Sequence, residues 1–418
     1  MTTWSCVLAL ASAGAVACSA LVGVEEVRLR STSDGAVIDD SGEDPDVDPG
    51  RDGAVTVDAS VQLALGYLHT CARKNDGKVR CWGDNGAGQL GDGISFDAGP
   101  RAPALVPQEV PGINDAVQLA SGLSHSCVVH RAGTVSCWGL NSFGQLGNAT
   151  ETRSSSPVDV IGVTDAVSVA CGTSFTCALL EGGTVSCWGA NYSGQLGDGT
   201  KIDRPTAAAV SQLSGVTALA AAENHACAIL TGGTVKCWGR NTDGQLGNGS
   251  TTESLVPTPL GSLANVAQIV AASRFTCARI ASGQVNCWGA NADGQLGTGS
   301  SNLAPNPSPA ITNVADAVSI GVGYDHACAA RRTGDVACWG SAGSGQVGSG
   351  SVPADASIPS PTAVVGVSGA LDVSTGGDHS CATTASGAVF CWGNNVFGQL
   401  GNGTTQRAYA AVPVKSFP

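Results

Sequence analysis

Short apolar stretches in which every second residue is hydrophobic recur along most of this chain, separated by glycine and asparagine. In one copy, Val167-Ser-Val-Ala is followed by Phe175-Thr-Cys-Ala-Leu-Leu and then by Gly183-Thr-Val-Ser-Cys-Trp-Gly. Alternation with a period of two predicts β-strands rather than helices, and the polar clusters predict the turns between them. We therefore expect an all-β protein built from short antiparallel strands.

This strand pattern belongs to a unit that occurs seven times. The tripeptide Cys-Trp-Gly marks each copy, and consecutive tryptophans of these tripeptides are 56, 50, 50, 50, 51 and 53 residues apart. A period of this length is typical of propeller blades and solenoid units. The region from Ser60 to Pro418 is too long for one conventional core, but its length suits a ring of repeats.

Each cysteine of a Cys-Trp-Gly tripeptide follows another cysteine by ten residues. The two cysteines are equally far from a glycine-rich tip, so they face each other in an antiparallel hairpin, where Cβ atoms approach to about 4.5–5.5 Å. Zinc binding is the alternative, but it needs four converging ligands, and this spacing favours disulfides. The predicted bridges are Cys71–Cys81, Cys127–Cys137, Cys177–Cys187, Cys227–Cys237, Cys277–Cys287, Cys328–Cys338 and Cys381–Cys391.

Three motifs recur in the unit, and the second copy contains them as Gly122-Leu-Ser-His125, Gly133-Thr-Val-Ser-Cys-Trp138-Gly139 and Asn141-Ser-Phe-Gly-Gln145-Leu-Gly147. These motifs resemble the repeat of the regulator of chromosome condensation family. The resemblance covers residues 60–418 and implies a seven-bladed β-propeller with four-stranded antiparallel blades. The chain departs from the family pattern in its paired cysteines, where cytosolic relatives have aliphatic or aromatic residues. This difference indicates an exported branch, because disulfides persist in oxidising compartments.

The ends of the repeat region predict how the ring closes. Six segments between repeats carry a Pro/Val strand, such as Ser156-Pro-Val-Asp-Val160, and a seventh, Ala410-Ala-Val-Pro-Val414, follows the last repeat. The first repeat has no such segment before it. We therefore expect the C-terminal strand to pair into the blade of the first repeat, which removes the open edges of the ring.

Residues 1–18 have the features of an export signal. Val7 to Ala17 form an apolar stretch of suitable length, and Cys18 follows directly. Ala15-Val-Ala17 fits ordinary signal cleavage, whereas the cysteine after it resembles a bacterial lipobox, although Ala15 stands where leucine is commonest. We favour lipidation at Cys18 and an outer-membrane or cell-surface location; without the lipid, the protein would be periplasmic or secreted.

Residues 19–59 are predicted to be an acidic flexible linker. Asp34 to Asp58 contains nine acidic residues with glycine and proline among them and few large apolar side chains, a composition typical of a solvated tether. Asp44, Asp46 and Asp48 alternate as in a calcium loop. However, Pro49 stands where such a loop has glycine, and no glutamate closes it, so a charged tether is preferred.

The overall composition limits the choice of partners. The formal net charge is −13, from 20 Lys and Arg against 33 Asp and Glu, which argues against binding to a nucleic-acid backbone. Beyond the N-terminal stretch, no apolar run reaches the ~18 residues that a spanning helix needs. We expect a monomer that contacts a membrane only through its lipid and that uses no metal or cofactor.

Residues present in every repeat are expected to serve the blade rather than a specific site. The seven tryptophans are therefore predicted to lie in the core. A glutamine also recurs in each copy and is expected to satisfy backbone groups between blades; the set is Gln89, Gln145, Gln195, Gln245, Gln295, Gln346 and Gln399. None of these residues is a catalytic candidate.

One repeat position holds phenylalanine in two copies, Phe175 and Phe275, and histidine in the other five: His69, His125, His225, His326 and His379. A ring of imidazoles could bind metal, but a position that accepts phenylalanine is better explained by packing with an optional hydrogen bond. His130 lies outside this pattern, at a hairpin tip, and is expected to be exposed. Cys171 has no partner in the pairing scheme and is expected to be a buried free thiol.

The two residues after the repeated asparagine differ between copies, and they are the candidates for a specific site. Phe397, Phe143 and Tyr192 occur there in repeats seven, two and three, which are near neighbours around a closed ring, while Asp243 and Asp293 face the other side. Exposed aromatic side chains on loops over a rigid scaffold are typical anchors for a protein partner. The alternative is that they are scattered loop residues without a joint role.

Three function classes are compatible with these features. The resemblance implies a non-enzymatic binding scaffold, since family members act by binding: one promotes nucleotide exchange on a nuclear GTPase, and a secreted bacterial relative inhibits β-lactamase. We favour a scaffold that binds a protein or polymer in the cell envelope or outside the cell. A structural envelope protein is the second possibility. A propeller enzyme such as a lyase or glycosidase is the third, but no constellation of acids, tyrosine and histidine supports it.

Overall fold

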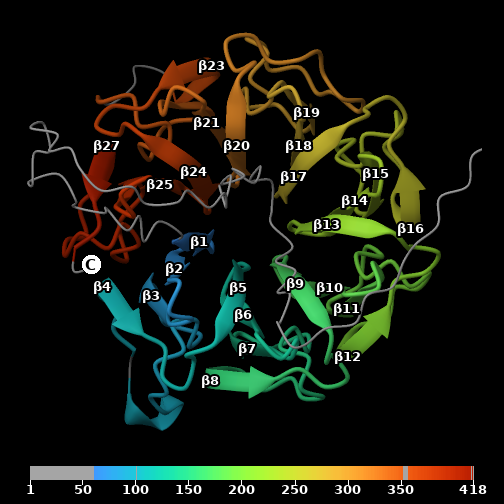
Figure 1. The fold of residues 1–418 in the computed structure, drawn as a ribbon, viewed down its shortest axis with the longest axis vertical. Helices are drawn as coiled ribbons and strands as arrows, with labels where there is room; N and C mark the ends of the chain where they lie inside the picture. Colours follow the sequence, from blue (N-terminus) through green and yellow to red (C-terminus); the bar gives the residue numbers. More distant parts are fainter. Residues whose placement is uncertain (1–60, 100, 352–355, 416, 418) are drawn as a thin grey trace, which may run out of the picture. The chain divides into compact units, whose positions relative to one another are not determined.

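The structure, a computed structural model, describes residues 61–99, 101–351, 356–415 and 417. Seven antiparallel sheets are arranged in a ring, one for each repeat (Figure 1). The predicted signal at 1–18, the linker at 19–59 and the calcium alternative at Asp44 to Asp48 lie outside the described residues. Within the described ranges, no helix is long and apolar enough to cross a membrane.

Each blade begins with an innermost strand close to the ring axis (Figure 1). These strands are β1 (Gln62–Leu65), β5 (Ala116–Ser121), β9 (Ala166–Cys171), β13 (Val216–Ala221), β17 (Val266–Ala272), β20 (Ala317–Val322) and β24 (Ala370–Thr375). The second strands follow outward: β2 (His69–Arg73), β6 (His125–His130), β10 (Phe175–Leu180), β14 (His225–Leu230), β18 (Phe275–Ile280), β21 (His326–Arg331) and β25 (His379–Thr384).

The third strand of each blade carries the Cys-Trp-Gly tripeptide. These strands are β3 (Val79–Gly83), β7 (Val135–Gly139), β11 (Val185–Gly189), β15 (Thr234–Gly239), β19 (Val285–Gly289), β22 (Val336–Ser341) and β26 (Val389–Gly393). The outermost strands are β4 (Ala104–Glu109), β8 (Ser154–Asp159), β12 (Arg204–Ala209), β16 (Ser254–Pro259), β23 (Ser357–Ala363) and β27 (Ala408–Pro413). A short 3-10 helix, η1 (Phe96–Ala98), lies in the loop before β4. The all-β, seven-bladed prediction is confirmed.

The fifth blade departs from the predicted four strands. Its sheet has three, β17 to β19, and the place of the fourth is taken by a single bridge between Gly289 and Ala304. Pro305, Pro307 and Pro309 follow this bridge. Because proline has no backbone N–H to donate to a ladder, three prolines at alternate positions prevent a regular outer strand.

The predicted pairing of the C-terminal strand with the first blade is wrong. β27 pairs with β26 of its own repeat, with Val412 opposite Cys391. Outside the fifth blade, the segment after each repeat thus forms the outer strand of that same repeat, paired antiparallel with its third strand. The ring closes by contacts between the seventh and first blades instead. Leu63 and Trp82 of the first blade share a buried cluster with Leu400 and Val414, and the backbone N–H of Gly403 donates to the carbonyl of Leu105 in β4 at 2.9 Å.

All seven predicted disulfides are confirmed. The two cysteines of each pair face each other across the second and third strands, with Cα atoms 4.0–4.1 Å apart. Cys171 is a buried free cysteine, also as predicted. Because these fourteen sulfurs are bonded to one another, they are not available as zinc thiolates, and the bridges require an oxidising environment.

Adjacent blades are joined by a repeated set of hydrogen bonds, which we call the blade seam. The seven tryptophans are almost completely buried, and each indole N–H donates to the backbone carbonyl of the glutamine in the preceding blade, at 2.9–3.0 Å. The glutamine therefore does link blades through its carbonyl, and in three copies its side-chain nitrogen also donates to the next blade: Gln195 to Asn224, Gln295 to Asp325 and Gln346 to Asp378. Its side-chain oxygen accepts a bond from a backbone N–H two residues earlier in the same loop, as in Gln145 with Phe143.

The histidine position completes the seam. In all five copies the imidazole Nε2 lies 2.8–2.9 Å from a serine or threonine hydroxyl of the next blade. The hydroxyls of Thr70, Thr176, Thr276 and Ser380 also donate to the glutamine carbonyl, so these four must accept the hydrogen of Nε2. Phe175 and Phe275 face Ala226 and Ala327 at the hydroxyl position. The packing interpretation is therefore confirmed.

The invariant glycine of Cys-Trp-Gly has a steric cause. Gly139 has a φ of 107°, and a Cβ atom there would lie 2.4 Å from the carbonyl oxygen of Ser124. A side chain would clash with the backbone at the start of the second strand. This glycine therefore allows the third strand to approach the histidine position closely.

Candidate binding face

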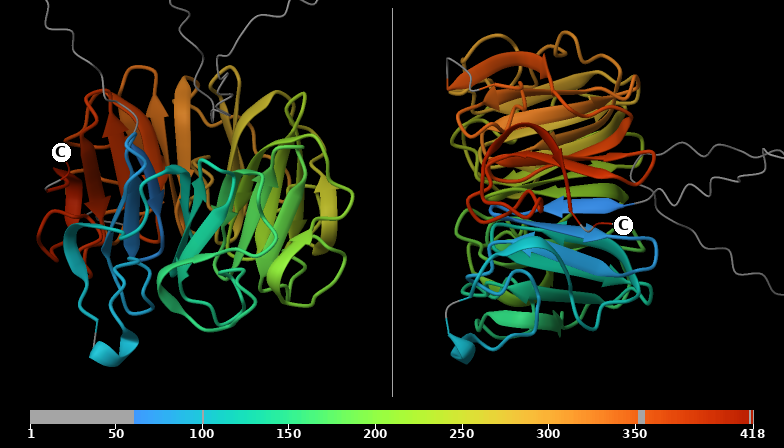
Figure 2. Two further views of the ribbon diagram at one scale, coloured as in Figure 1. Left: turned by 60° about the horizontal axis from the view of Figure 1, so that its bottom comes forward. Right: turned by 90° about the vertical axis from the view of Figure 1, so that its left-hand side faces the viewer.

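The loops that vary between repeats lie at one end of the ring, which we call the loop face. Because consecutive strands of a blade are antiparallel, the loop after the first strand and the loop after the third strand emerge at the same end. The second-to-third hairpins and the connections to the next blade emerge at the other. The side views of Figure 2 show the strands running between these two ends.

The three predicted anchor residues lie in third-to-fourth loops of this face, on blades two, three and seven. Phe143 is 39% exposed and Tyr192 is 50% exposed, whereas Phe397 is half-buried. The Tyr192 hydroxyl donates to the side-chain oxygen of Asn224 in the next blade. Val396, beside Phe397, is exposed in the same loop. Two of the three predicted aromatics are therefore accessible as they stand.

A cavity of about 190 Å³ lies on the ring axis. Every blade contributes to its wall, with residues from the end of the innermost strand and from the loop that follows it. Most of these residues are small, but Tyr67, Tyr324 and Glu223 also line it. The tyrosine rings of blades one and six meet edge to face, with centroids 5.8 Å apart and planes at 71°.

Carboxylates surround the tyrosine pair. Burial raises the pKa of Tyr67, and the charges of Asp378 and Asp325, with Tyr324, raise it further. The pKa of Asp325 itself is raised to about 6, first by burial and then by Asp293 and Asp378, against the opposing charge of Arg274. Burial also raises the pKa of Asp378, against Arg407. This part of the loop face is therefore rich in incompletely neutralised negative charge.

A second group of charges lies on blades four and five. Glu223 is 3.9 Å from Arg240 and accepts a bond from Ser273 at 3.4 Å. Asp243 is 3.9 Å from Arg240 and 3.8 Å from Arg274. Because the two arginines and the two carboxylates lie 3.8–3.9 Å apart, none of these ion pairs is a close bidentate one.

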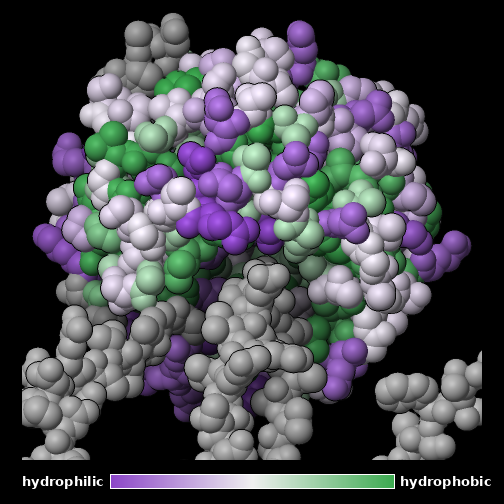
Figure 3. Space-filling view, turned by 45° about the horizontal axis from the view of Figure 1, so that its top comes forward, coloured by the Kyte–Doolittle hydropathy of each residue, from purple (hydrophilic) through white to green (hydrophobic). Residues whose placement is uncertain are grey.

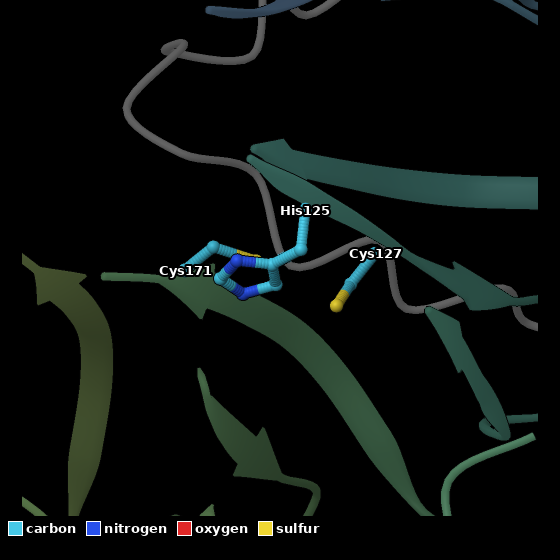
Figure 4. Close-up of side chains that lie close together, drawn as sticks. All are labelled: His125, Cys127 and Cys171. Carbon is cyan, nitrogen blue, oxygen red and sulfur yellow. The ribbon is translucent and has the colours of Figure 1, made fainter. Parts of the chain in front are cut away.

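His125, Cys127 and Cys171 form the one group of potential metal ligands among the described residues, with ligand atoms within 4.8 Å of one another (Figure 4). Cys127 is bonded to Cys137, and burial raises the pKa of the Cys171 thiol to about 12. Burial also lowers the pKa of His125 to about 4. The cluster thus offers a neutral imidazole and a protonated thiol, a poor donor set for a metal.

His130 is less exposed than predicted. Its ring nitrogens lie 2.6 Å from the carboxylate of Asp115 and 2.8 Å from the hydroxyl of Ser136, and its side chain is only 15% exposed. The residue ends β6 and does not sit on the turn itself. These partners fix it against the neighbouring strands.

Sequence reasoning missed the axial cavity and its tyrosines. Tyr67 and Tyr324 occupy the residue after glycine in the Gly-x-x-His element, and this position holds leucine, threonine, glutamate, serine or glycine in other copies. This variation between copies is the same criterion that selected Phe143, Tyr192 and Phe397, so it could also have identified Tyr67 and Tyr324 as candidates. When the ring of Figure 1 is tilted so that its top comes forward, hydrophilic and hydrophobic residues are interspersed on the side that faces the viewer (Figure 3).

The chain was also compared with known proteins. The RCC1-like domain model matches residues 1–278, and models of the regulator of chromosome condensation (RCC1) repeat match 282–330, 317–346, 371–399 and 386–417. A probable E3 ubiquitin-protein ligase, HERC4 of Rattus norvegicus, is 42% identical over 87 residues, which are 21% of this chain and 8% of the ligase. Human HERC3 is 38% identical over 97 residues, 23% of this chain and 9% of that protein. The chain thus matches less than a tenth of each of these relatives.

Solved structures share the fold. Human WBSCR16 superimposes with a TM-score of 0.72 at 23% identity, covering 81% of this chain and 94% of that one. Prp20p of Saccharomyces cerevisiae, described with its binding to Gsp1p and histones, gives 0.71 at 22% identity, covering 86% and 88%. At these identities the likeness supports the fold alone. Together with the RCC1-like match over more than half of the sequence, the seven-bladed ring shows that this chain belongs to the RCC1-like domain family.

Proposed function

We propose that this protein is a non-enzymatic scaffold that binds a protein partner through its loop face. The observation that carries the proposal is the exposure of Phe143 and Tyr192 on loops of blades that the disulfides and the seam hold rigid. Aromatic side chains on a preorganised surface lose little conformational entropy on binding, and they dominate the affinity of many interfaces. The half-buried Phe397 of the seventh blade is included in this surface.

The relatives support binding as the mode of action. Prp20p is described with Gsp1p and histones, and in another structure yeast RCC1 is bound to Kap60. Those partners belong to those proteins. The ligase relatives match this chain over 8–9% of their own length, so their enzymatic activity is no guide to this chain, and we propose that it has none.

We place the protein in the cell envelope or outside the cell, as a lipoprotein anchored at Cys18. Seven disulfides support an oxidising compartment. In this arrangement residues 1–18 are the signal, and residues 19–59 hold the propeller away from the membrane. Changing Cys18 to Ala should move the protein from the membrane fraction to the soluble fraction without altering its thermal unfolding. A wild-type protein that is already soluble, with an unmodified Cys18, would favour ordinary signal cleavage.

Affinity capture from envelope extract tests the binding role. The bait is the full chain, compared with the variant Phe143→Ser, Tyr192→Ser, Phe397→Ser. The matched control is Ile161→Ser, Val365→Ser, because both residues are about half exposed on the opposite end of the ring. We expect wild type and control to retain the same protein and the loop-face variant to lose it. Equal retention by all three would place the site elsewhere, and retention of nothing by folded wild type would favour a structural role.

A further inference from the structure

The axial cavity has the size of a side-chain end rather than of a free ligand. Its volume is about 190 Å³, whereas pockets for drug-sized molecules measure about 300–1,000 Å³. A lysine or arginine side chain projecting from a bound protein is within this range.

The wall of the cavity is suited to a cation. The two tyrosine rings present π-electron density, which attracts ammonium and guanidinium groups within about 6 Å of a ring centroid. Glu223 brings a carboxylate from blade four. The other described residues of the wall are uncharged, and most are glycine, alanine, serine or threonine. No lysine or arginine is among them, so nothing in this wall repels a positive group.

The surrounding charges favour the same ligand. Asp325 directly follows Tyr324, and Asp378 directly follows Gly377, both in loops that line the cavity. The charge of Arg274 opposes the rise in the pKa of Asp325, and that of Arg407 opposes the rise in the pKa of Asp378. Arg240 lies 3.9 Å from Glu223. The pKa values of both aspartates stay raised despite these cations, because burial, together with the charges of Asp293 and Asp378 in the case of Asp325, outweighs them. A cation entering from the partner would offset these effects further.

We propose that the axial cavity receives the charged end of one lysine or arginine side chain of the protein partner, held against Tyr67 and Tyr324 and paired with Glu223. The identity of the occupant as a partner's side chain rests on the proposed function. The preference for a positive group rests on the cavity itself. The loop-face aromatics then supply apolar contact at the rim, and the cavity supplies selection for a basic residue at the centre.

The test uses the intact protein and two short peptides, acetyl-Gly-Arg-Gly-amide and its citrulline counterpart, which has a similar shape without the charge. Binding is followed by NMR. We expect the arginine peptide to bind and the citrulline peptide to bind at least roughly fivefold more weakly. Tyr324→Ala and Glu223→Gln should each weaken the arginine peptide by a similar factor. The matched control is Thr173→Ala, which changes a neutral wall residue and should leave binding unchanged.

Thermal unfolding identifies variants that have lost their fold, and Glu223→Gln preserves the shape of the side chain if Tyr324→Ala proves unstable. Equal binding of both peptides, wild-type affinity in both variants, or no binding of the arginine peptide would each overturn the cation site. The proposed function is judged separately by the captured partner. If the arginine peptide binds as expected but the loop-face variant still captures the partner, the cavity assignment stands and the aromatic anchors are wrong.

Discussion

Residues of the blade seam and of the loop face lie only one or two positions apart along the chain. However, the seam residues recur from repeat to repeat, whereas the loop-face residues vary. At the seam, the tryptophan, the glutamine carbonyl and the histidine or phenylalanine position recur around the ring with nearly identical distances. At the loop face, the residue two positions before this seam position is Tyr67 in one blade, Glu223 in another and Gly377 in a third. Positions that keep the same residue type in the repeats therefore hold the ring together, and positions whose residue varies are those where a specific site can form.

Removing a seam tryptophan should have the largest effect. Trp238 is fully buried, and its indole donates to the carbonyl of Gln195 at 2.9 Å. We expect Trp238→Ala to lower the free energy of unfolding by about 3–5 kcal/mol, because it leaves a cavity and an unpaired carbonyl. Chemical denaturation measures this loss. A cost as small as that of an exposed loop substitution would show that the seam does not hold the blades together.

Removing one disulfide should cost somewhat less. Replacing Cys227 and Cys237 together by alanine opens a loop with a sequence separation of 10, for which chain entropy predicts about 2.5–3 kcal/mol. Denaturation of the oxidised protein measures the loss. Thiol titration of the denatured wild type without reductant should find Cys171 reactive and the fourteen paired cysteines unreactive. About fourteen reactive thiols would contradict both the bridges and the oxidising compartment.

The seam histidines should make the ring sensitive to acid. Burial lowers the pKa of His326 to about 3, against about 6.5 in an unfolded chain. As pH falls below about 6.5, the unfolded chain binds protons that the folded protein does not, so stability falls until about pH 3 and then levels off. For this one histidine the loss between pH 8 and pH 5 is about 2 kcal/mol.

The chain itself supplies the matched variant for this effect, since Phe175 faces Ala226. His326→Phe combined with Ser380→Ala copies that pair at another seam. We expect the double variant to lose about 2 kcal/mol less stability than wild type over the same pH range. Urea denaturation at the two pH values provides the comparison, and identical losses would mean that His326 is protonated in the folded ring.

The sequence predicted the ring, the blades and every bridge because each depends on a pattern that is present many times. The sequence also shows that histidine is followed by a hydroxyl residue in the next repeat, as His69 by Ser126, and phenylalanine by alanine, as Phe275 by Ala327. This correlation is evident once equivalent positions of adjacent repeats are compared. The prediction for the C-terminal strand is wrong because a segment between two repeats can pair with the repeat before it or with the repeat after it. The sequence pattern does not distinguish the two, and the structure shows pairing with the repeat before it. The axial cavity was missed because it is formed by single residues from seven distant loops, and no local pattern shows that they meet.

The smallest stability effect belongs to the loop-face variant Phe143→Ser, Tyr192→Ser, Phe397→Ser. Phe143 and Tyr192 are exposed, and exposed loop substitutions usually cost no more than about 0.5 kcal/mol each; the half-buried Phe397 should cost somewhat more. An anchoring aromatic, by contrast, contributes about 1–2 kcal/mol or more to binding.

The most direct test of the distinction between seam and face is the dissociation constant of the captured partner, measured for this variant and for the seam variant His326→Phe, Ser380→Ala at neutral pH. The account predicts that the loop-face variant binds at least roughly tenfold more weakly, while the seam variant binds like wild type. Wild-type affinity in the folded loop-face variant, with weaker binding in the seam variant, would contradict it.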